Sequence, residues 1–107
     1  DMKQVDPTKA ILTKEEVISI LKKEMPYLKE HFNVSEIALF GSYARDEADI
    51  KSDIDILVTY SKTPGMISFM KLENYLTDLF GVKVDLVLKN ALRPNIGKSV
   101  LNEAMYA

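Results

Sequence analysis

The chain has 107 residues, which is enough for one hydrophobic core and too few for two. It contains no cysteine, so disulfides, thiolate catalysis and cysteine-based zinc sites are excluded. The formal net charge is −2 and the lysines are scattered, which argues against a protein whose main task is to grip a nucleic-acid backbone.

The start of the chain shows no sign of export. There is no apolar run of about 18 residues and no signal peptide, so we expect a cytoplasmic protein without membrane contact. Asp1 ahead of Met2 is typical of a residue left by cloning before a native start. We expect residues 1–12 to form a flexible leader to a single domain that spans residues 1–107.

A long amphipathic helix is expected first. Thr13–Glu16 has the capping-box pattern, and apolar residues then recur at helical spacing. Pro26 should kink or split this helix, because proline lacks the backbone N–H and clashes with the preceding turn. His31 follows a charged helix end and fits a C-terminal cap or a surface residue better than a metal ligand. The apolar positions are Val17, Leu21, Met25, Leu28 and Phe32.

Two strands and a short helix are expected next. Ile37–Phe40 is a short apolar run that predicts a strand, and the residues after Gly41 favour a short helix. A second strand is predicted near Asp53–Tyr60, and the sequence Thr-Pro-Gly at 63–65 indicates a turn.

The rest of the chain predicts a helix at Met66–Phe80 stopped by Gly81, a strand at Val82–Leu88 and a last helix from about Pro94 to Tyr106. The helix between the last two strands supplies the crossover that a parallel pair requires. We therefore expect an α/β or α+β fold, with a small mixed sheet of about three strands and helices packed on it. The residues expected to be buried are Phe69, Met70, Leu72, Leu76 and Leu79 in the first helix and Ile96, Val100, Leu101 and Ala104 in the second.

Three aspartates carry the strongest chemical signal. Gly41-Ser42 is followed, after ten intervening residues, by Asp53-Ile54-Asp55, and Asp85 lies in the next predicted strand. Side chains at i and i+2 leave a strand on the same face, so Asp53 and Asp55 should project together. Two carboxylates on one patch repel each other unless they share a cation or a proton. Magnesium fits, because it is a hard ion that takes oxygen ligands and bridges to phosphates.

A third carboxylate opens the possibility of two metal ions, one supporting the attacking oxygen and the other the leaving pyrophosphate. Asp85 is placed to be that third ligand. The alternative interpretation is structural: Asp53 caps a strand, Asp55 pairs with a lysine, and Asp85 pairs with Lys83 or Lys89.

Gly41-Ser42 lies where a strand gives way to a helix. Backbone N–H groups at a helix start are unsatisfied, so a phosphate could be bound there, and glycine permits a close approach. The Ser42 hydroxyl could donate one more hydrogen bond, and Arg45 could reach a phosphate oxygen or an acid of the site. Alternatively, Ser42 is a plain N-cap and Arg45 forms a surface or structural salt bridge.

The runs Leu39–Arg45, Ser52–Val58 and Val84–Val87 together resemble the DNA polymerase beta-like nucleotidyltransferase superfamily. More narrowly, the chain from about Glu15 to its end resembles the minimal nucleotidyltransferase (MNT) domains of prokaryotes. The resemblance implies a palm-like fold. One departure is Asp46, which stands where the family commonly has glycine and would weaken nucleotide binding if it pointed inward.

The resemblance also assigns roles. Asp53 and Asp55 would hold the magnesium ions, and two ions are expected. Asp85 would complete the metal site and help to deprotonate the acceptor. Gly41-Ser42 would hold the nucleoside triphosphate.

The acceptor is expected to come with a partner, because nothing in the chain remains unassigned once the catalytic layer is built. Relatives of this kind are often paired with a HEPN-domain protein, commonly a toxin RNase. The resemblance thus implies an antitoxin that transfers AMP from ATP onto a tyrosine of that partner.

Two other functions remain open. A binding module with a vestigial site could neutralise a HEPN partner by contact, through apolar residues on the first and last helices. Transfer to a small molecule would need an acceptor pocket supplied by an oligomer or a second chain.

Overall fold

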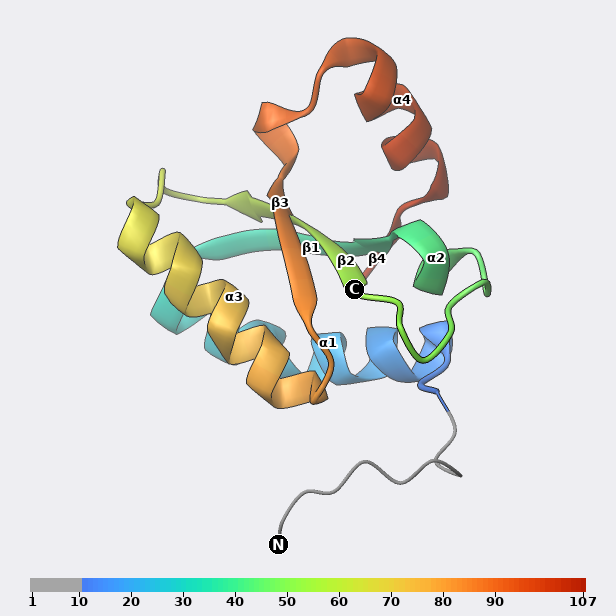
Figure 1. Ribbon diagram of the computed structural model, residues 1–107. Helices are drawn as coiled ribbons and strands as arrows, with labels where there is room; N and C mark the ends of the chain where they lie inside the picture. The colour runs from blue at the N-terminus through green and yellow to red at the C-terminus, as the bar shows by residue number, and fades with distance from the viewer. Residues whose placement is uncertain (1–10) are drawn as a thin grey trace, which may run out of the picture.

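The computed structural model describes residues 11–107, and most of the expected leader, residues 1–10, lies outside the described part. Helices and strands alternate along the chain, as Figure 1 shows. In order, the elements are α1 (Lys14–Phe32), β1 (Val34–Phe40), α2 (Gly41–Ala44), β2 (Ile54–Tyr60), α3 (Met66–Phe80), β3 (Val84–Leu88), the 3-10 turn η1 (Lys89–Ala91), α4 (Pro94–Glu103) and β4 (Met105–Tyr106).

The strands form one mixed sheet in the order β3-β2-β1-β4. β2 and β3 are parallel and are joined through α3, as the crossover argument predicts, whereas β1 is antiparallel to both β2 and β4. Figure 1 shows α1 and α3 together on one side of the sheet and α4 on the other. The expected architecture, a small mixed sheet with helices packed on it, is confirmed, with one short strand more than expected.

The start of α1 is fixed by the predicted capping box. The Thr13 N–H donates to Glu16 Oε1 at 2.8 Å, and the Glu16 N–H donates to Thr13 Oγ1 at 3.1 Å. The helix continues past Pro26 without splitting. His31 is exposed in the last turn and stacks on Tyr27 with 4.1 Å between ring centroids, which confirms it as a surface residue.

The predicted bounds of α3 are confirmed. Gly81 ends the helix in the left-handed conformation, with φ of 68°, and its N–H donates to the Thr77 carbonyl at 2.8 Å. The expected burial of Met70 is wrong, because that side chain is 53% exposed on the outer face of the helix, and Phe80 is buried at the end of α3 instead.

The core lies between the sheet and the α1–α3 layer. Ile54, Ile56 and Val58 contribute alternate side chains of β2 to it, so this side of the sheet is its helix-covered face. The two helices are also joined by a hydrogen bond of 2.5 Å from the Tyr75 hydroxyl to Glu24 Oε1. The fully buried large side chains are Val17, Leu21, Leu28, Val34, Ile37, Leu39, Ile54, Ile56, Leu57, Val58, Leu72 and Leu76.

Side chains of α3 protect the outer edge of β3. The Val84 N–H donates to Thr77 Oγ1 and the Leu86 N–H donates to Glu73 Oε2, both at 3.0 Å. An edge strand leaves alternate N–H groups unpaired, and these two contacts satisfy two of those groups. On its other edge β3 pairs with β2 in a parallel register that runs from Val84 opposite Ile54 to Leu88 opposite Val58.

The predicted end of the last helix is wrong. α4 stops at Glu103, Ala104 is extended with ψ of 136°, and the chain then pairs with β1 as β4. The expected burial of Leu101 is also wrong, since it is 43% exposed. A two-residue strand has too short a pattern to be distinguished from a continuing helix. Among residues 11–107, no helix combines the length and apolar character needed to span a bilayer.

Candidate active site

Strand register brings the site segments together at one end of the sheet. Asp55 and Asp85 are direct partners in the parallel β2–β3 pair, and Phe40 pairs with Asp55 across the antiparallel β1–β2 ladder. Gly41-Ser42 follows Phe40 at once, so the acids and the Gly-Ser turn meet although they are distant in sequence.

The acids project away from the core. Because Ile54 and Ile56 point to the helix-covered face, Asp55 between them points to the opposite side, which we call the acid-bearing face. Asp85 shares this face by register. Asp55 is half-buried, whereas Asp85 is exposed.

A self-bonded turn presents Asp53 just before β2. Within it, the Asp49 N–H donates to Ser52 Oγ at 2.9 Å, and the Ser52 N–H donates to the Asp49 carbonyl at 3.0 Å. The Lys51 N–H donates to Asp49 Oδ1 at 2.9 Å. The backbone that enters Asp53 is thereby restricted by local hydrogen bonds.

Gly41 is required where the turn meets the acids. Its φ is +75°, a left-handed value that residues with a Cβ adopt at a cost. A Cβ built there would collide with the Asp55 carboxylate, lying 2.9 Å from Asp55 Cγ. The Gly-Ser turn and the second aspartate are thus in direct contact, which only glycine permits.

The charge at Asp55 is poorly stabilised by the protein itself. Burial, followed by the negative charges of Asp85 and Asp53, raises the pKa of Asp55 to about 6, while the positive charge of Arg45 acts in the opposite direction. Two neighbouring acids therefore oppose ionisation of this carboxyl. A bound cation would remove that opposition.

The structural alternatives for the three aspartates find little support. Lys83 Nζ lies 3.9 Å from Asp53 Oδ2, a long contact between exposed groups, and Lys89 pairs with Glu36 at 3.5 Å. Within residues 11–107, neither Asp55 nor Asp85 forms an ion pair with a lysine.

The side chains as they stand do not enclose a metal ion. In the part of the chain that the structure describes, no three acidic or histidine side chains are grouped closely enough to hold one. The donor set still suits magnesium, because Asp55 and Asp85 are register partners with unrelieved repulsion and Asp53 is two residues away. Closing these oxygens around an ion needs side-chain rotation, which the exposure of Asp85 permits.

Ser42 is not an N-cap. The cap of α2 is Phe40, which makes no side-chain hydrogen bond, and Ser42 is the second residue of the helix itself. Among the described residues, the Ser42 hydroxyl has no hydrogen-bond partner, so the structural role considered for it is not observed.

Arg45 is held by two glutamates. Its Nε donates to Glu47 Oε1 at 3.0 Å, and its Nη1 donates to both Glu103 oxygens at 3.1 and 3.2 Å. Glu103 Oε2 also accepts the Gly41 N–H at 2.8 Å. The salt-bridge interpretation of Arg45 is therefore observed in this state, and a carboxylate already occupies donors expected to bind phosphate.

Sequence reasoning missed Glu103. It lies 62 residues from Gly41 in the chain, so no local pattern connects the two. One weak signal was available: an acid near the C-terminal end of a helix is unfavourable for the helix dipole unless a partner satisfies it.

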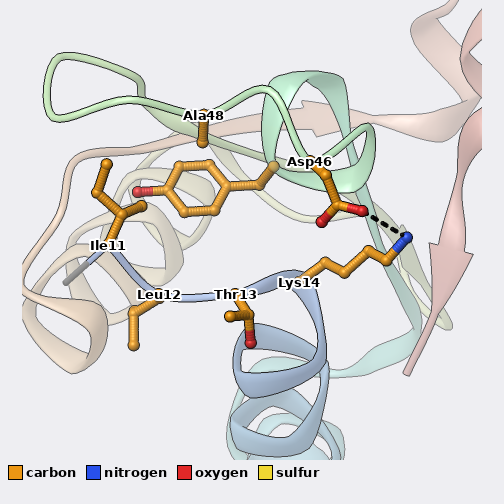
Figure 2. Close-up of a pocket in the computed structure, with 7 residues that line it drawn as sticks. Ile11, Leu12, Thr13, Lys14, Asp46 and Ala48 are labelled. Atoms are coloured by element: carbon orange, nitrogen blue, oxygen red, sulfur yellow. Dashed lines mark ion pairs between the residues drawn. The ribbon is translucent and has the colours of Figure 1, made fainter.

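Asp46 does not point into the site. It takes a left-handed φ of 59°, the conformation for which the family's glycine is suited, and its Oδ2 lies 3.0 Å from Lys14 Nζ. Figure 2 shows this ion pair at the edge of an open pocket of about 180 Å³, with Ile11, Leu12 and Ala48 around it. The departure from the family pattern thus places no negative charge against Gly41.

Comparison with known proteins identifies the family of the chain. The model of the family described as "Nucleotidyltransferase domain" matches residues 10–107. A protein adenylyltransferase MntA of Thermococcus cleftensis is 48% identical over 97 residues, covering 91% of this chain and 98% of that protein. A solved structure described as a minimal nucleotidyltransferase is 29% identical, with a TM-score of 0.74, covering 91% of this chain and 98% of its own.

Solved toxin–antitoxin complexes are also similar. A chain in a toxin–antitoxin crystal structure with AMP-PNP is 26% identical, with a TM-score of 0.65, covering 89% of this chain and 72% of that one. A chain from a complex of a tri-AMPylated Shewanella oneidensis HEPN toxin with an MNT antitoxin is 25% identical, with a TM-score of 0.56, covering 87% and 66%. The resemblance seen in the sequence motifs and the expected fold class are both confirmed.

Proposed function

Because the chain belongs to the nucleotidyltransferase domain family, we propose that it is a magnesium-dependent enzyme that transfers AMP from ATP to a hydroxyl of a partner protein. The partner proposed is a HEPN-domain toxin, which makes this chain its antitoxin. The names of the similar proteins support this, since they include a protein adenylyltransferase and a complex with an AMPylated HEPN toxin. The observation that carries the proposal is the direct contact of the Asp55 carboxylate with Gly41.

The reaction is a substitution at phosphorus. The acceptor hydroxyl gives up its proton, its oxygen forms a bond to the α-phosphorus, and the bond to pyrophosphate breaks. Asp53 and Asp55 are the residues proposed to hold magnesium, with Asp85 completing the set; the ion offsets phosphate charge and lowers the pKa of a coordinated hydroxyl.

The position of each site residue suits it to a different part of the proposed reaction. Gly41 and Ser42 offer a backbone N–H and a hydroxyl to the phosphates at the end of β1. Asp85 is the most exposed of the three aspartates, so it suits contact with an acceptor arriving from solvent and uptake of the acceptor proton. Asp55, half-buried against Gly41, suits the nucleotide side.

The test is transfer of labelled AMP. The chain, labelled ATP, magnesium and the protein encoded beside it should yield a labelled partner, and chelation of magnesium should stop the reaction. Replacing Asp53 and Asp55 together by Asn should lower the rate by roughly a thousandfold or more. Asp78→Asn is the matched control, because Asp78 is an exposed acid on α3.

A contact-only antitoxin is the second candidate. Glu103 already accepts the Gly41 N–H of the Gly-Ser turn, and Met66, Ile67 and Met70 expose apolar surface on α3. The first and last helices also expose apolar surface, as expected, at Tyr27 on α1 and Leu101 on α4. If the double Asn variant still neutralises the partner in full, contact suffices and the transfer proposal is wrong.

A further inference from the structure

Glu103 occupies the place that the proposed function gives to a phosphate. Its carboxylate accepts the Gly41 N–H at 2.8 Å and receives Arg45 Nη1 on both oxygens at 3.1 and 3.2 Å. These are charge-assisted hydrogen bonds of the kind that bind phosphate oxygens. We propose that Glu103 is a built-in competitor of the nucleotide, so that the triphosphate is bound only when this carboxylate is displaced.

Burial of the turn explains why such a competitor is present. Gly41 is buried, and an unpaired buried N–H costs stability, so this group needs a partner in the nucleotide-free protein. Glu103 supplies that partner and at the same time satisfies Arg45. A phosphate that takes over both donors replaces one anion by another, with no donor left unpaired.

The displacement needs little backbone movement. Directly after Glu103 the chain is paired with β1, where Met105 faces Leu39 and Tyr106 faces Ala38. The backbone of α4 is therefore anchored next to the site. The Glu103 side chain is 24% exposed, so rotation about its own bonds can carry the carboxylate to solvent.

Electrostatics make the two states exclusive. A carboxylate and a triphosphate cannot share the Gly41 N–H, and two anions this close repel each other. Glu103 should therefore weaken nucleotide binding. This inference depends on the proposed function, since it assumes that the site binds a nucleoside triphosphate.

The test compares AMP-PNP affinity, with magnesium, in the wild-type chain and in Glu103→Gln and Glu103→Ala, by calorimetry. Both variants should lower the Kd by about tenfold, since a charged competitor is removed. The Kd of inorganic tripolyphosphate should fall in the same way, because this ligand carries the phosphate charge of the nucleotide but lacks the adenine base. Two variants are used so that loss of folding in the alanine variant, detected by thermal unfolding, leaves the glutamine variant informative.

Glu47→Gln is the matched control. Glu47 also pairs with Arg45, but it does not touch Gly41 and its side chain is 64% exposed, so the Kd should change by less than about twofold. Equal or weaker AMP-PNP binding in both Glu103 variants would overturn the inference alone. If no variant and no wild-type chain binds AMP-PNP, the inference and the proposed function both fail.

Discussion

The helix-covered face and the acid-bearing face are built from alternate residues of the same strands. On the first, Ile54, Ile56 and Val58 are fully buried and pack with α1 and α3. On the second, Asp55 and Asp85 stand side by side, and burial together with their mutual repulsion raises the pKa of Asp55 to about 6. One face stabilises the fold, whereas the other keeps charges that the fold alone does not satisfy, as is common where a ligand is to be bound.

The largest stability effect is expected on the helix-covered face. Leu76→Ala should lower the free energy of unfolding by about 2–5 kcal/mol, because Leu76 is fully buried and its loss leaves a cavity. Met70→Ala on the same helix should cost less than about 0.5 kcal/mol, since Met70 is 53% exposed. Urea unfolding of both variants measures the contrast, and similar losses would contradict the assignment of faces.

The junction of the two regions should be the next most sensitive. Gly41→Ala should cost about 1–3 kcal/mol of unfolding free energy, because it adds backbone strain and a collision with Asp55. Gly65→Ala is the control, since a Cβ there meets nothing within 4 Å. Thermal unfolding measures the loss of stability in the two variants. Equal losses would show that the contact between Gly41 and Asp55 is not tight.

A smaller effect is expected at the joint between α1 and α3. Tyr75→Phe removes the hydrogen bond to Glu24 and should cost about 1 kcal/mol. This bond, together with partial burial and the charge of Glu24, raises the pKa of Tyr75 to about 12, above its ordinary value of 10.0. Its contribution should therefore be present below pH 10 and lost as the pH rises toward 12. When the free energy of unfolding is measured from pH 10 to pH 12, the difference between the variant and the wild type should disappear.

The smallest stability effect should come from the acid-bearing face. Asp85→Asn should change the unfolding free energy by less than about 0.5 kcal/mol, because Asp85 is exposed and forms no ion pair within residues 11–107. The same change should slow AMP transfer by at least about a hundredfold. A stable variant that retains full transfer would remove Asp85 from the proposed site.

Local signals in the sequence predicted much of the fold. The capping box at Thr13, the helical spacing in Met66–Phe80 and the stop at Gly81 each depend on neighbouring residues, and each is confirmed. The parallel strand pair followed from the length of the crossover. The strand β4 was missed because two residues have no periodicity to recognise.

The candidate site was predictable only where it is encoded by short motifs. The register of β2 and β3 brings Asp55 and Asp85 together, as the motifs implied, and the catalytic and metal-binding roles of the three aspartates stay predictions. The contacts of Glu103 and the orientation of Asp46 depend on tertiary structure, because their partners, Gly41 and Lys14, lie far along the chain. The spacing of residues along the chain does not predict contacts between such distant positions.

The most direct test of the acid-bearing face is a crystal structure with AMP-PNP and manganese, read by anomalous diffraction. The account predicts a manganese peak bound by Asp53 and Asp55, and phosphate oxygens against Gly41 and Ser42. A bound nucleotide whose manganese touches none of the three aspartates, or whose phosphates lie away from the Gly-Ser turn, would contradict it.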